Sequence, residues 1–359
     1  MEAPSSASKI SMPQYLLLRA IFSTKGTTAL KSVCKKPGAG EKIVSKEIWS
    51  ESENYLKGLT SWKTYLASIT GSPHQEGTFA LVRYYQQLTN ETRNDPSEED
   101  LMSKVTFSPR PVRKTTNRYA SRPEPETPTR STKLKEQESS PSDLIERVEN
   151  LDMTPSDNAS SPSELGDMSP ISADMAINYK AIEDEQIVNT ALVLFLNAVT
   201  LHYTNISSEW TLYRRPFTVQ KVNRQKVYEA RVDGLLRSKG SQARAQALIE
   251  VKPYVRRNNT RMQEAAQMAA WIAEDPPRSY NQHPAEKHRR LLISQNRHQI
   301  FVNVASFEGE YATYIRGESK TTNSFLAITE YGPFDVTDRD HMKNLGIAML
   351  AFSLQGGLL

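Results

Sequence analysis

Two short apolar segments carry charged residues where buried strands are expected. The first, "YEARVDGLLRS" at 228–238, contains Asp233, and the second, "AQALIEVKPYV" at 245–255, contains Glu250 and Lys252. Because side chains on a strand alternate between its two faces, Glu250 and Lys252 should share one face, with Ile249 and Val251 on the other. Buried charges are costly unless they are paired or bound to a metal. These three charged residues are therefore the first candidates for chemistry.

If the two segments are neighbouring strands, Asp233 is expected beside Glu250, where the two carboxylates repel and raise each other's pKa. A divalent cation removes this cost, and hard oxygen ligands favour magnesium or manganese. The Lys252 ammonium group could then orient or help to deprotonate a bound water, or stabilise charge developing on a phosphate. The alternative is a cross-strand salt bridge in which Asp233 or Glu250 pairs with Lys252 or Arg231.

The elements around these segments predict an α/β domain over residues 174–359, with a mixed β-sheet flanked by helices. A long helix is expected before the first strand and another between the second strand and the prolines at 276 and 277. Further strands and a last helix follow. The expected helices are 176–203, 260–275 and 338–355, and the later strands lie within 290–317 and 325–332.

An Asp, a turn of variable length and then Glu-x-Lys on the next strand resemble the signature of the PD-(D/E)xK nuclease superfamily, the restriction-endonuclease-like proteins. The whole of 174–359 resembles uncharacterised fungal proteins with such a domain, although Val232 stands where the motif has proline. The resemblance implies a magnesium- or manganese-dependent nuclease. In that reading Asp233, Glu250 and the Val251 carbonyl hold the metal, and Lys252 positions the attacking water.

The resemblance also implies supporting residues on both flanking helices. Glu185 is the expected acid on the first helix, because it shares a helical face with Asn189 and the leucines that follow. The alternative is an acid that only stabilises the first turn of the helix. On the second helix, Gln267 is expected to face the site, with Gln263 one turn before it on the same face. For both glutamines the alternative is a solvated helix face.

Basic residues are concentrated around the motif, with eleven Lys or Arg against three Asp or Glu between Lys221 and Arg261. Such a cluster favours a polyanionic partner, and nucleic acid, DNA rather than RNA, is the expected one. The alternative is a solvated basic surface. The residues expected to contact phosphates are Lys239, Arg244, Arg256, Arg257 and Arg261.

The first half of the chain has a different character. Residues 1–44 are expected to form a loose arm, and 45–95 a helical hairpin that packs on the second domain or on a partner. Residues 96–172 are rich in Ser, Pro and Thr and predict a disordered linker. Six serines or threonines in the linker precede proline: Ser108, Thr127, Ser140, Thr154, Ser161 and Ser169. They indicate proline-directed kinases as partners, and the alternative is that such pairs are simply common in disordered segments.

The sequence also limits the cellular compartments in which the protein is expected. A single cysteine, Cys34, excludes an intramolecular disulfide framework and fits a reducing environment. No apolar run reaches the roughly 18 residues of a membrane span, so no membrane association is expected. An intracellular protein of the nucleus or cytoplasm is predicted, with the mitochondrion less favoured. The competing function is a nuclease-fold module without turnover, which binds nucleic acid or a protein partner and is regulated through the linker.

Overall fold

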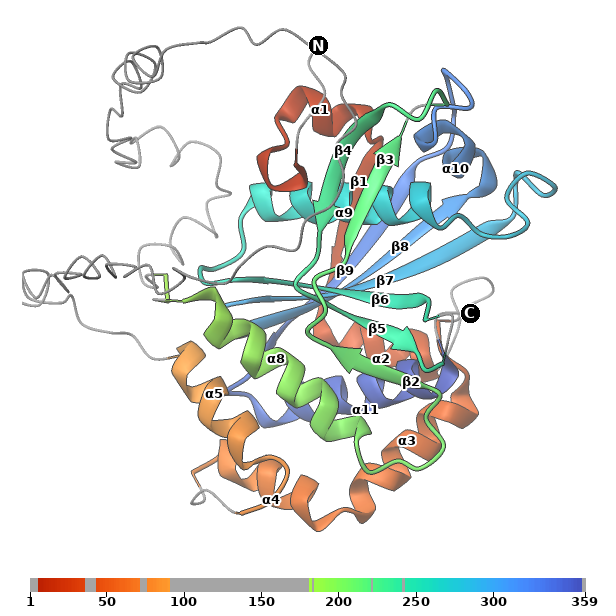
Figure 1. Cartoon of the computed structure of the whole chain (residues 1–359). Coiled ribbons are helices and arrows are strands. Elements are labelled where there is room, and N and C mark those ends of the chain that lie inside the picture. Colours follow the sequence, from red (N-terminus) through yellow and green to blue (C-terminus); the bar gives the residue numbers. More distant parts are fainter. Residues whose placement is uncertain are drawn as a thin grey trace, which may run out of the picture. The chain divides into compact units, whose positions relative to one another are not determined.

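A mixed seven-stranded sheet lies at the centre of the protein (Figure 1). The computed structural model describes residues 6–35, 43–71, 76–90, 181–182, 184–220, 222–240 and 243–356. In spatial order the strands are β1 (Ala20–Lys25), β9 (Leu326–Asp335), β8 (Gln299–Glu308), β7 (Lys287–Asn296), β6 (Ala245–Lys252), β5 (Gly234–Ser238) and β2 (Ser208–Thr211). The pairs β1–β9 and β6–β7 are parallel, and the other neighbouring pairs are antiparallel. The predicted mixed sheet with flanking helices is confirmed.

Helices cover both faces of this sheet. One face packs against α9 (Asn258–Glu274), α10 (Gly309–Ile315) and α1 (Met12–Leu17), and the short turn at Ala7–Lys9 lies with them. The other face packs against α8 (Glu185–Thr200) and α11 (Arg339–Gln355). Strand β6 shows why two layers form, because Leu248 belongs to the α9 core while Ile249 and Val251 belong to the α8 and α11 core.

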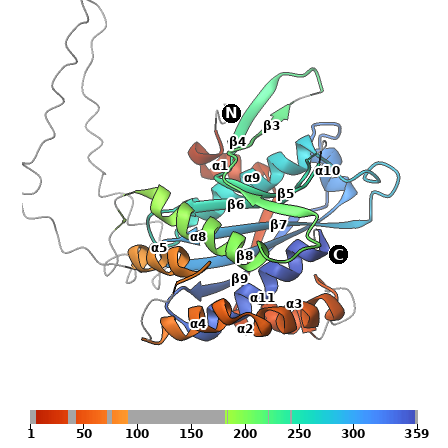
Figure 2. The same cartoon turned by 60° about the horizontal axis from the view of Figure 1, so that its bottom comes forward.

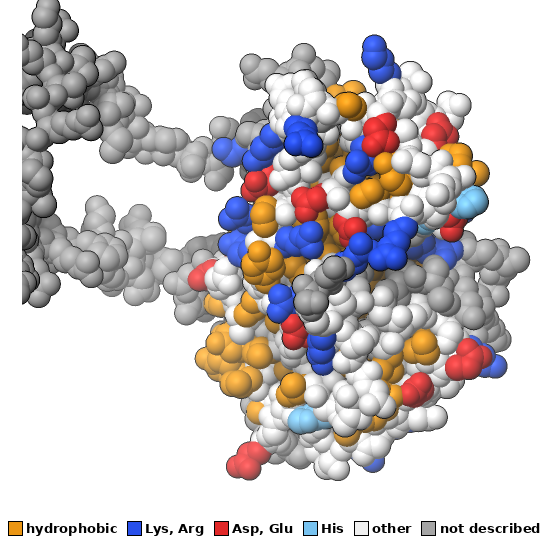
Figure 3. Space-filling view, turned by 45° about the vertical axis from the view of Figure 1, so that its right-hand side comes forward, with side chains coloured by type: hydrophobic (Ala, Val, Ile, Leu, Met, Phe, Trp, Pro, Cys, Tyr) orange, Lys and Arg blue, Asp and Glu red, His pale blue; other side chains and the backbone are white. Residues whose placement is uncertain are grey.

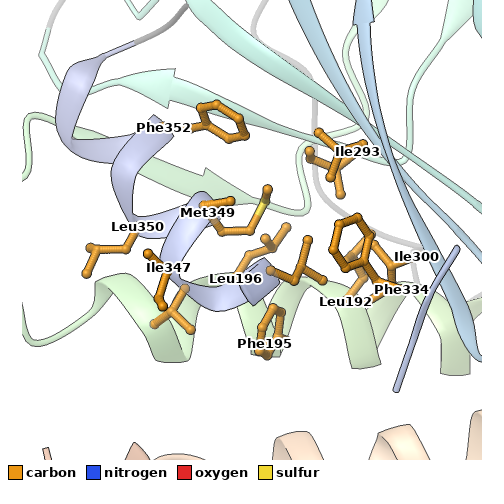
Figure 4. Packing of buried hydrophobic residues seen from close by; sticks show 14 of the residues in the cluster. Leu192, Phe195, Leu196, Ile293, Ile300, Phe334, Ile347, Met349, Leu350 and Phe352 are labelled. Atoms are coloured by element: carbon orange, nitrogen blue, oxygen red, sulfur yellow. The ribbon is translucent and has the colours of Figure 1, made fainter. Parts of the chain in front are cut away.

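The core beneath α8 fixes the helix that precedes the motif strands. Figure 4 shows side chains from α8 and α11 meeting residues of the sheet strands β7, β8 and β9. They include Leu192 and Leu196 of α8, Met349 and Phe352 of α11, and Ile293 of β7, all essentially excluded from solvent. The helix itself begins at Glu185, where the Asp184 side chain accepts a hydrogen bond from the Gln186 amide at 2.8 Å. Just before the helix, the Ile182 amide donates to the Pro253 carbonyl at 2.7 Å, which ties the start of α8 to the chain that follows β6.

The predicted strand 228–238 is two strands in the structure. It bends at Val232 and Asp233, so that β4 (Lys226–Arg231) pairs with β3 (Pro216–Gln220) in a separate ribbon, whereas β5 stays in the main sheet. Figure 2 shows this ribbon extending away from the sheet. Gly234 permits the bend, because a Cβ there would lie 2.6 Å from the Thr211 carbonyl oxygen. Helix α10 likewise occupies residues that were expected to continue the strands of 290–317.

The prediction that residues 1–44 form a loose arm is wrong for the described part of that segment. Residues 20–25 form β1, the edge strand that pairs in parallel with β9, and α2 (Thr27–Lys35) follows it. Leu18, Leu30 and Cys34 are buried. A parallel partner some 300 residues later leaves no local pattern, and an edge strand tolerates the polar residues Ser23 and Thr24.

The expected helical hairpin at 45–95 is three helices within the described residues. They are α3 (Lys46–Gly58), α4 (Thr60–Ile69) and α5 (Ala80–Asn90), and the chain breaks between α3 and α4 at the extended residue Leu59. Trp49, Trp62 and Tyr65 are buried in the same core as α8 and α11. These helices therefore belong to the α/β fold. The expected linker at 96–172 lies outside the described residues.

Candidate active site

Asp233 and Glu250 lie on neighbouring strands near the carboxyl end of β6. Asp233 directly precedes β5, which pairs with β6 so that Gly234 is opposite Ile249. The Asp233 amide donates to the Ile249 carbonyl at 3.0 Å, and the Val251 amide donates to Asp233 Oδ2 at 3.1 Å. This two-way connection fixes the Asp233 carboxylate beside the motif strand, as the sequence predicted. In open α/β sheets, ligands bind outside the carboxyl ends of strands.

Glu250 is buried, with 1% of its surface exposed. Its Oε1 atom lies 2.6 Å from Lys252 Nζ and accepts a hydrogen bond of 2.6 Å from Gln263 Nε2. Its Oε2 atom accepts a hydrogen bond from Gln267 Nε2. Burial raises the pKa of Glu250, Lys252 lowers it, and the charge of Asp233 raises it further. Asp233 therefore lies close enough to Glu250 for its charge to oppose ionisation of the Glu250 carboxyl group.

Lys252 connects Glu250 to the first helix. Its Nζ atom lies 3.6 Å from Glu185 Oε2, and 12% of its side chain is exposed. Burial by itself lowers the pKa of Lys252, but the Glu250 carboxylate more than offsets this and the net pKa is raised. Lys252 is therefore an ammonium group at neutral pH. The pKa of Glu185 is raised by burial, and Lys252 opposes that rise. Glu185 is both a first-turn acid and a partner of Lys252.

Both glutamines of α9 face Glu250. Gln267 is fully buried, and its Nε2 atom also donates to the Arg231 carbonyl at 3.1 Å. Its Oε1 atom has no hydrogen-bond partner among the described residues. The alternative of a solvated helix face does not hold, because both amides donate to the Glu250 carboxylate, Gln263 to the oxygen that Lys252 also contacts and Gln267 to the other oxygen. Sequence reasoning had favoured Gln267 over Gln263, and the structure uses both.

The oxygen atoms of this site are of the kind that a divalent cation prefers as ligands. The buried Glu250 carboxylate lies in the field of Asp233, and a cation is the group that relieves both charges. Among the described residues no cluster of three or more His, Cys, Asp or Glu side chains is arranged for a metal. The protein ligands would therefore be two carboxylates with the Val251 carbonyl. Magnesium suits such a site, because it keeps several waters and is bound through one or two carboxylates plus substrate phosphates.

Arg256 does not lie on the surface, where a phosphate contact had been predicted. Its side chain is 7% exposed and forms ion pairs with Glu264 of α9 and Glu330 of β9. It also donates to Ser294 Oγ and Asn296 Oδ1, each at 2.9 Å. This network of five residues ties α9 to β7 and β9. Arg256 therefore has a structural role, since its charge is already neutralised in the interior.

The other predicted phosphate contacts are distributed over the molecule. Arg261 pairs with Glu330 at 2.9 Å and is 32% exposed, so it flanks the Arg256 network. The Arg257 guanidinium stacks on the Tyr254 ring with its centre 4.6 Å from the ring centroid. Arg257 is linked to the site through Tyr254, because Lys252 and Glu185 both lie close enough to shift the pKa of Tyr254.

Lys239 and Arg244 flank the turn between β5 and β6, at the opposite end of β6 from Glu250. Strand β6 has eight residues, so its length separates this turn from the carboxylates by roughly 20 Å. Both side chains are exposed. The space-filling view of the right-hand side of Figure 1 shows Lys and Arg side chains in a band across the middle of that face (Figure 3). Lys239 and Arg244 are therefore not part of the site around Glu250.

Sequence reasoning missed Arg214 and did not assign a contact to Asn189. Arg214 Nη2 donates to Asp233 Oδ1 at 2.9 Å, and Asn189 Nδ2 of α8 donates to the Asp233 carbonyl at 3.3 Å. The only signal for Arg214 was its place in "LYRRP", where an aromatic residue precedes two arginines. Asn189 had been noted only as sharing the helical face of Glu185.

Comparison with models of protein families, with curated proteins and with solved structures gave no match for this chain. Within the described ranges, no helix has the length and apolar character needed to cross a bilayer.

Proposed function

We propose that this protein is a divalent-metal-dependent nuclease that hydrolyses phosphodiester bonds in nucleic acid, with DNA as its substrate. The observation that carries the proposal is the convergence of four elements on one buried carboxylate pair. The start of β5 supplies Asp233, β6 supplies Glu250 and Lys252, α8 brings Glu185 to Lys252, and α9 brings two glutamines to Glu250.

Asp233, Glu250 and the Val251 carbonyl would hold the cation. A bound magnesium or manganese ion supplies Lewis-acid activation of a phosphate and neutralises developing charge. Lys252 stays protonated, so it stabilises negative charge or orients a water by donating hydrogen bonds, and it does not act as a general base. Gln263 and Gln267 fix the Glu250 carboxylate, and Glu185 fixes the Lys252 ammonium group.

A cationic surface beside the carboxylates supports a polyanionic substrate. The side chains of Arg214 and Arg231 are 52% and 58% exposed. Arg214 pairs with Asp233, and Arg231 lies two residues before Asp233 in the chain. Leu212 and Tyr213 next to Arg214 are also more than half exposed. Arginine can contact phosphates, and an exposed aromatic ring can stack on a base. This loop, at 212–215, is the expected nucleic-acid contact nearest to the site.

One observation favours the second candidate, a nuclease-fold module that binds without turnover. All four oxygens of the Asp233 and Glu250 carboxylates already accept hydrogen bonds or ion pairs from protein groups. A site that is fully satisfied in this way can be retained for its structure alone. The binding module would act on nucleic acid or on a protein partner, with the kinase sites of the linker as its control.

The full-length protein should cleave DNA in the presence of magnesium or manganese and lose this activity when EDTA is added. Single-stranded, double-stranded and branched DNA are compared with RNA of the same sequence, and Asp233→Asn should abolish cleavage because it removes a metal-binding charge. Cleavage that needs no metal, or that survives in Asp233→Asn, would sink the proposal. Salt-dependent binding without cleavage, retained in Asp233→Asn, would instead support the binding module.

Cation binding to the full-length protein should weaken as the pH falls. Burial raises the pKa of Glu250, so the folded protein keeps this proton at pH values where a free glutamate has lost it. A cation must displace that proton, and its affinity should therefore fall by up to about tenfold per pH unit below the raised pKa. Manganese titrations from about pH 5.5 to 8.5 measure this slope. Glu250→Gln should bind weakly with no such slope, and a flat profile in the wild type would contradict the role given to Glu250.

A further inference from the structure

Arg214 places a positive charge on Asp233, where the proposed nuclease would bind its cation. Arg214 Nη2 lies 2.9 Å from Asp233 Oδ1, and its side chain is 52% exposed, whereas that of Asp233 is 5% exposed. Asp233 Oδ2 already accepts from the Val251 amide. The β6 backbone therefore holds Oδ2 in place, whereas among the described residues Oδ1 is held only by the Arg214 side chain. Movement of that side chain would free Oδ1 for another partner.

The loop that carries Arg214 is anchored on both sides of it. The Arg215 guanidinium pairs with Glu274 at 3.0 Å and stacks over the Phe217 ring with its centre 4.8 Å from the ring centroid. The Tyr213 amide donates to Thr211 Oγ1 at 3.1 Å. With its neighbours fixed in this way, Arg214 can change partner by side-chain rotation alone. Because the Arg214 side chain is half-exposed, water can solvate its guanidinium when it leaves Asp233. The Asp233 carboxylate is nearly buried, so the exchange is favourable when a cation takes the place of the guanidinium.

A guanidinium that leaves Asp233 needs another anion, and a phosphate is the one it binds best. Arginine forms two parallel hydrogen bonds to a phosphate, which are stronger and more specific than a single bond to a carboxylate oxygen. The exposed Leu212 and Tyr213 beside it mark the side from which a nucleic acid would approach. The same arginine can therefore contact Asp233 in the free protein and a substrate phosphate in the complex.

We propose that Arg214 blocks the cation site at Asp233 in the free protein and releases it when a nucleic-acid phosphate takes the guanidinium. This inference rests on the proposed nuclease function and adds a regulatory step to it. Cation and nucleic acid then bind with positive coupling, because each favours the conformation in which Arg214 has left Asp233. The free protein would hold the cation weakly and would be protected from unproductive chemistry.

Manganese binding to the full-length protein, followed by the electron paramagnetic resonance signal of free manganese, tests this inference without using activity. Arg214→Gln should bind manganese about threefold to tenfold more tightly than wild type, because it removes both a competitor and a repelling charge. Arg231→Gln is the matched control. It removes an equally exposed charge that pairs with Glu229 instead of Asp233, and its affinity should change much less.

A second measurement follows the affinity of the protein for DNA. Without metal, Arg214→Gln should bind DNA more weakly, and the slope of log affinity against log salt should fall by about one, because one phosphate contact is lost. Arg214→Lys should lie between wild type and Arg214→Gln in both measurements.

Two results would overturn the inference. If Asp233→Asn loses manganese but Arg214→Gln binds it like wild type, Arg214 does not gate the site, although the nuclease proposal stands. If neither wild type nor Arg214→Gln binds manganese at Asp233, the inference fails together with the proposed metal site.

Discussion

Replacing Arg256 with methionine should lower the free energy of unfolding by about 3–5 kcal/mol, because it leaves the buried Glu264 carboxylate without a counter-ion and Glu330 with only the partly exposed Arg261. Glu264 and Glu330 have side chains that are 0% and 4% exposed, and both pair with this guanidinium. Methionine has a similar reach and can keep the packing against the Phe301 ring, over which the guanidinium lies at 4.3 Å. The lost free energy of unfolding would then come from the missing charge and its hydrogen bonds and not from a cavity. Chemical denaturation of the full-length protein measures it.

Arg261→Met is the matched control for this substitution. Arg261 also pairs with Glu330 but is 32% exposed, so its removal should cost only about 1 kcal/mol or less. Combining Arg256→Met with Glu264→Leu and Glu330→Leu should recover most of the lost stability, since replacing a whole buried ionic network by apolar residues is often close to neutral. If Arg256→Met destabilises no more than Arg261→Met, the network is not the connection between α9 and the sheet that its geometry indicates.

The residues nearest the carboxylates could be predicted because their placement depends on short-range rules. The two-residue period of a strand placed Glu250 on the α9 face, and the pairing of β5 with β6 placed Asp233 beside it. The helical period placed Gln263 and Gln267 one turn apart, and both contact Glu250. In each case the information lies within a few residues of the motif, so no knowledge of the distant chain was needed.

The sequence was less informative where a contact depends on distant residues. The sequence predicts a phosphate contact for Arg256 because its charge is visible there, whereas its partner Glu330 is 74 residues away on β9. The pairing of β1 with β9 is longer in range still. Arg214 contacts Asp233 across 19 residues, and the β3–β4 ribbon lies between them in the chain. The composition reveals the excess of basic residues, but it does not distinguish the arginines that are buried in ionic networks from those on the surface.

Replacing Lys252 with methionine should reduce the rate of the chemical step by about 10²–10⁴-fold, the usual cost of removing a positioned acid or charge-stabilising donor. The Lys252 ammonium group is nearly buried between Glu250 and Glu185, at 2.6 Å and 3.6 Å from their oxygens. Because its pKa is raised, it carries its charge throughout the neutral range, and methionine removes that charge while keeping the length of the side chain. Single-turnover cleavage by the full-length protein measures the rate.

The expected loss is in rate and not in substrate binding, since Lys252 is largely shielded from solvent and contributes little to the outer cationic surface. DNA affinity measured in calcium should therefore stay within about threefold of wild type, well under the 1.4 kcal/mol that a tenfold change represents. Lys226→Met is the control for charge, because Lys226 is 54% exposed and pairs with Glu229 on the ribbon. Lys252→Arg keeps the charge but not the shape of the donor, and partial activity is expected of it. If Lys252→Met cleaves DNA as fast as Lys226→Met, the lysine serves only to neutralise Glu250, and catalysis must rest on other groups.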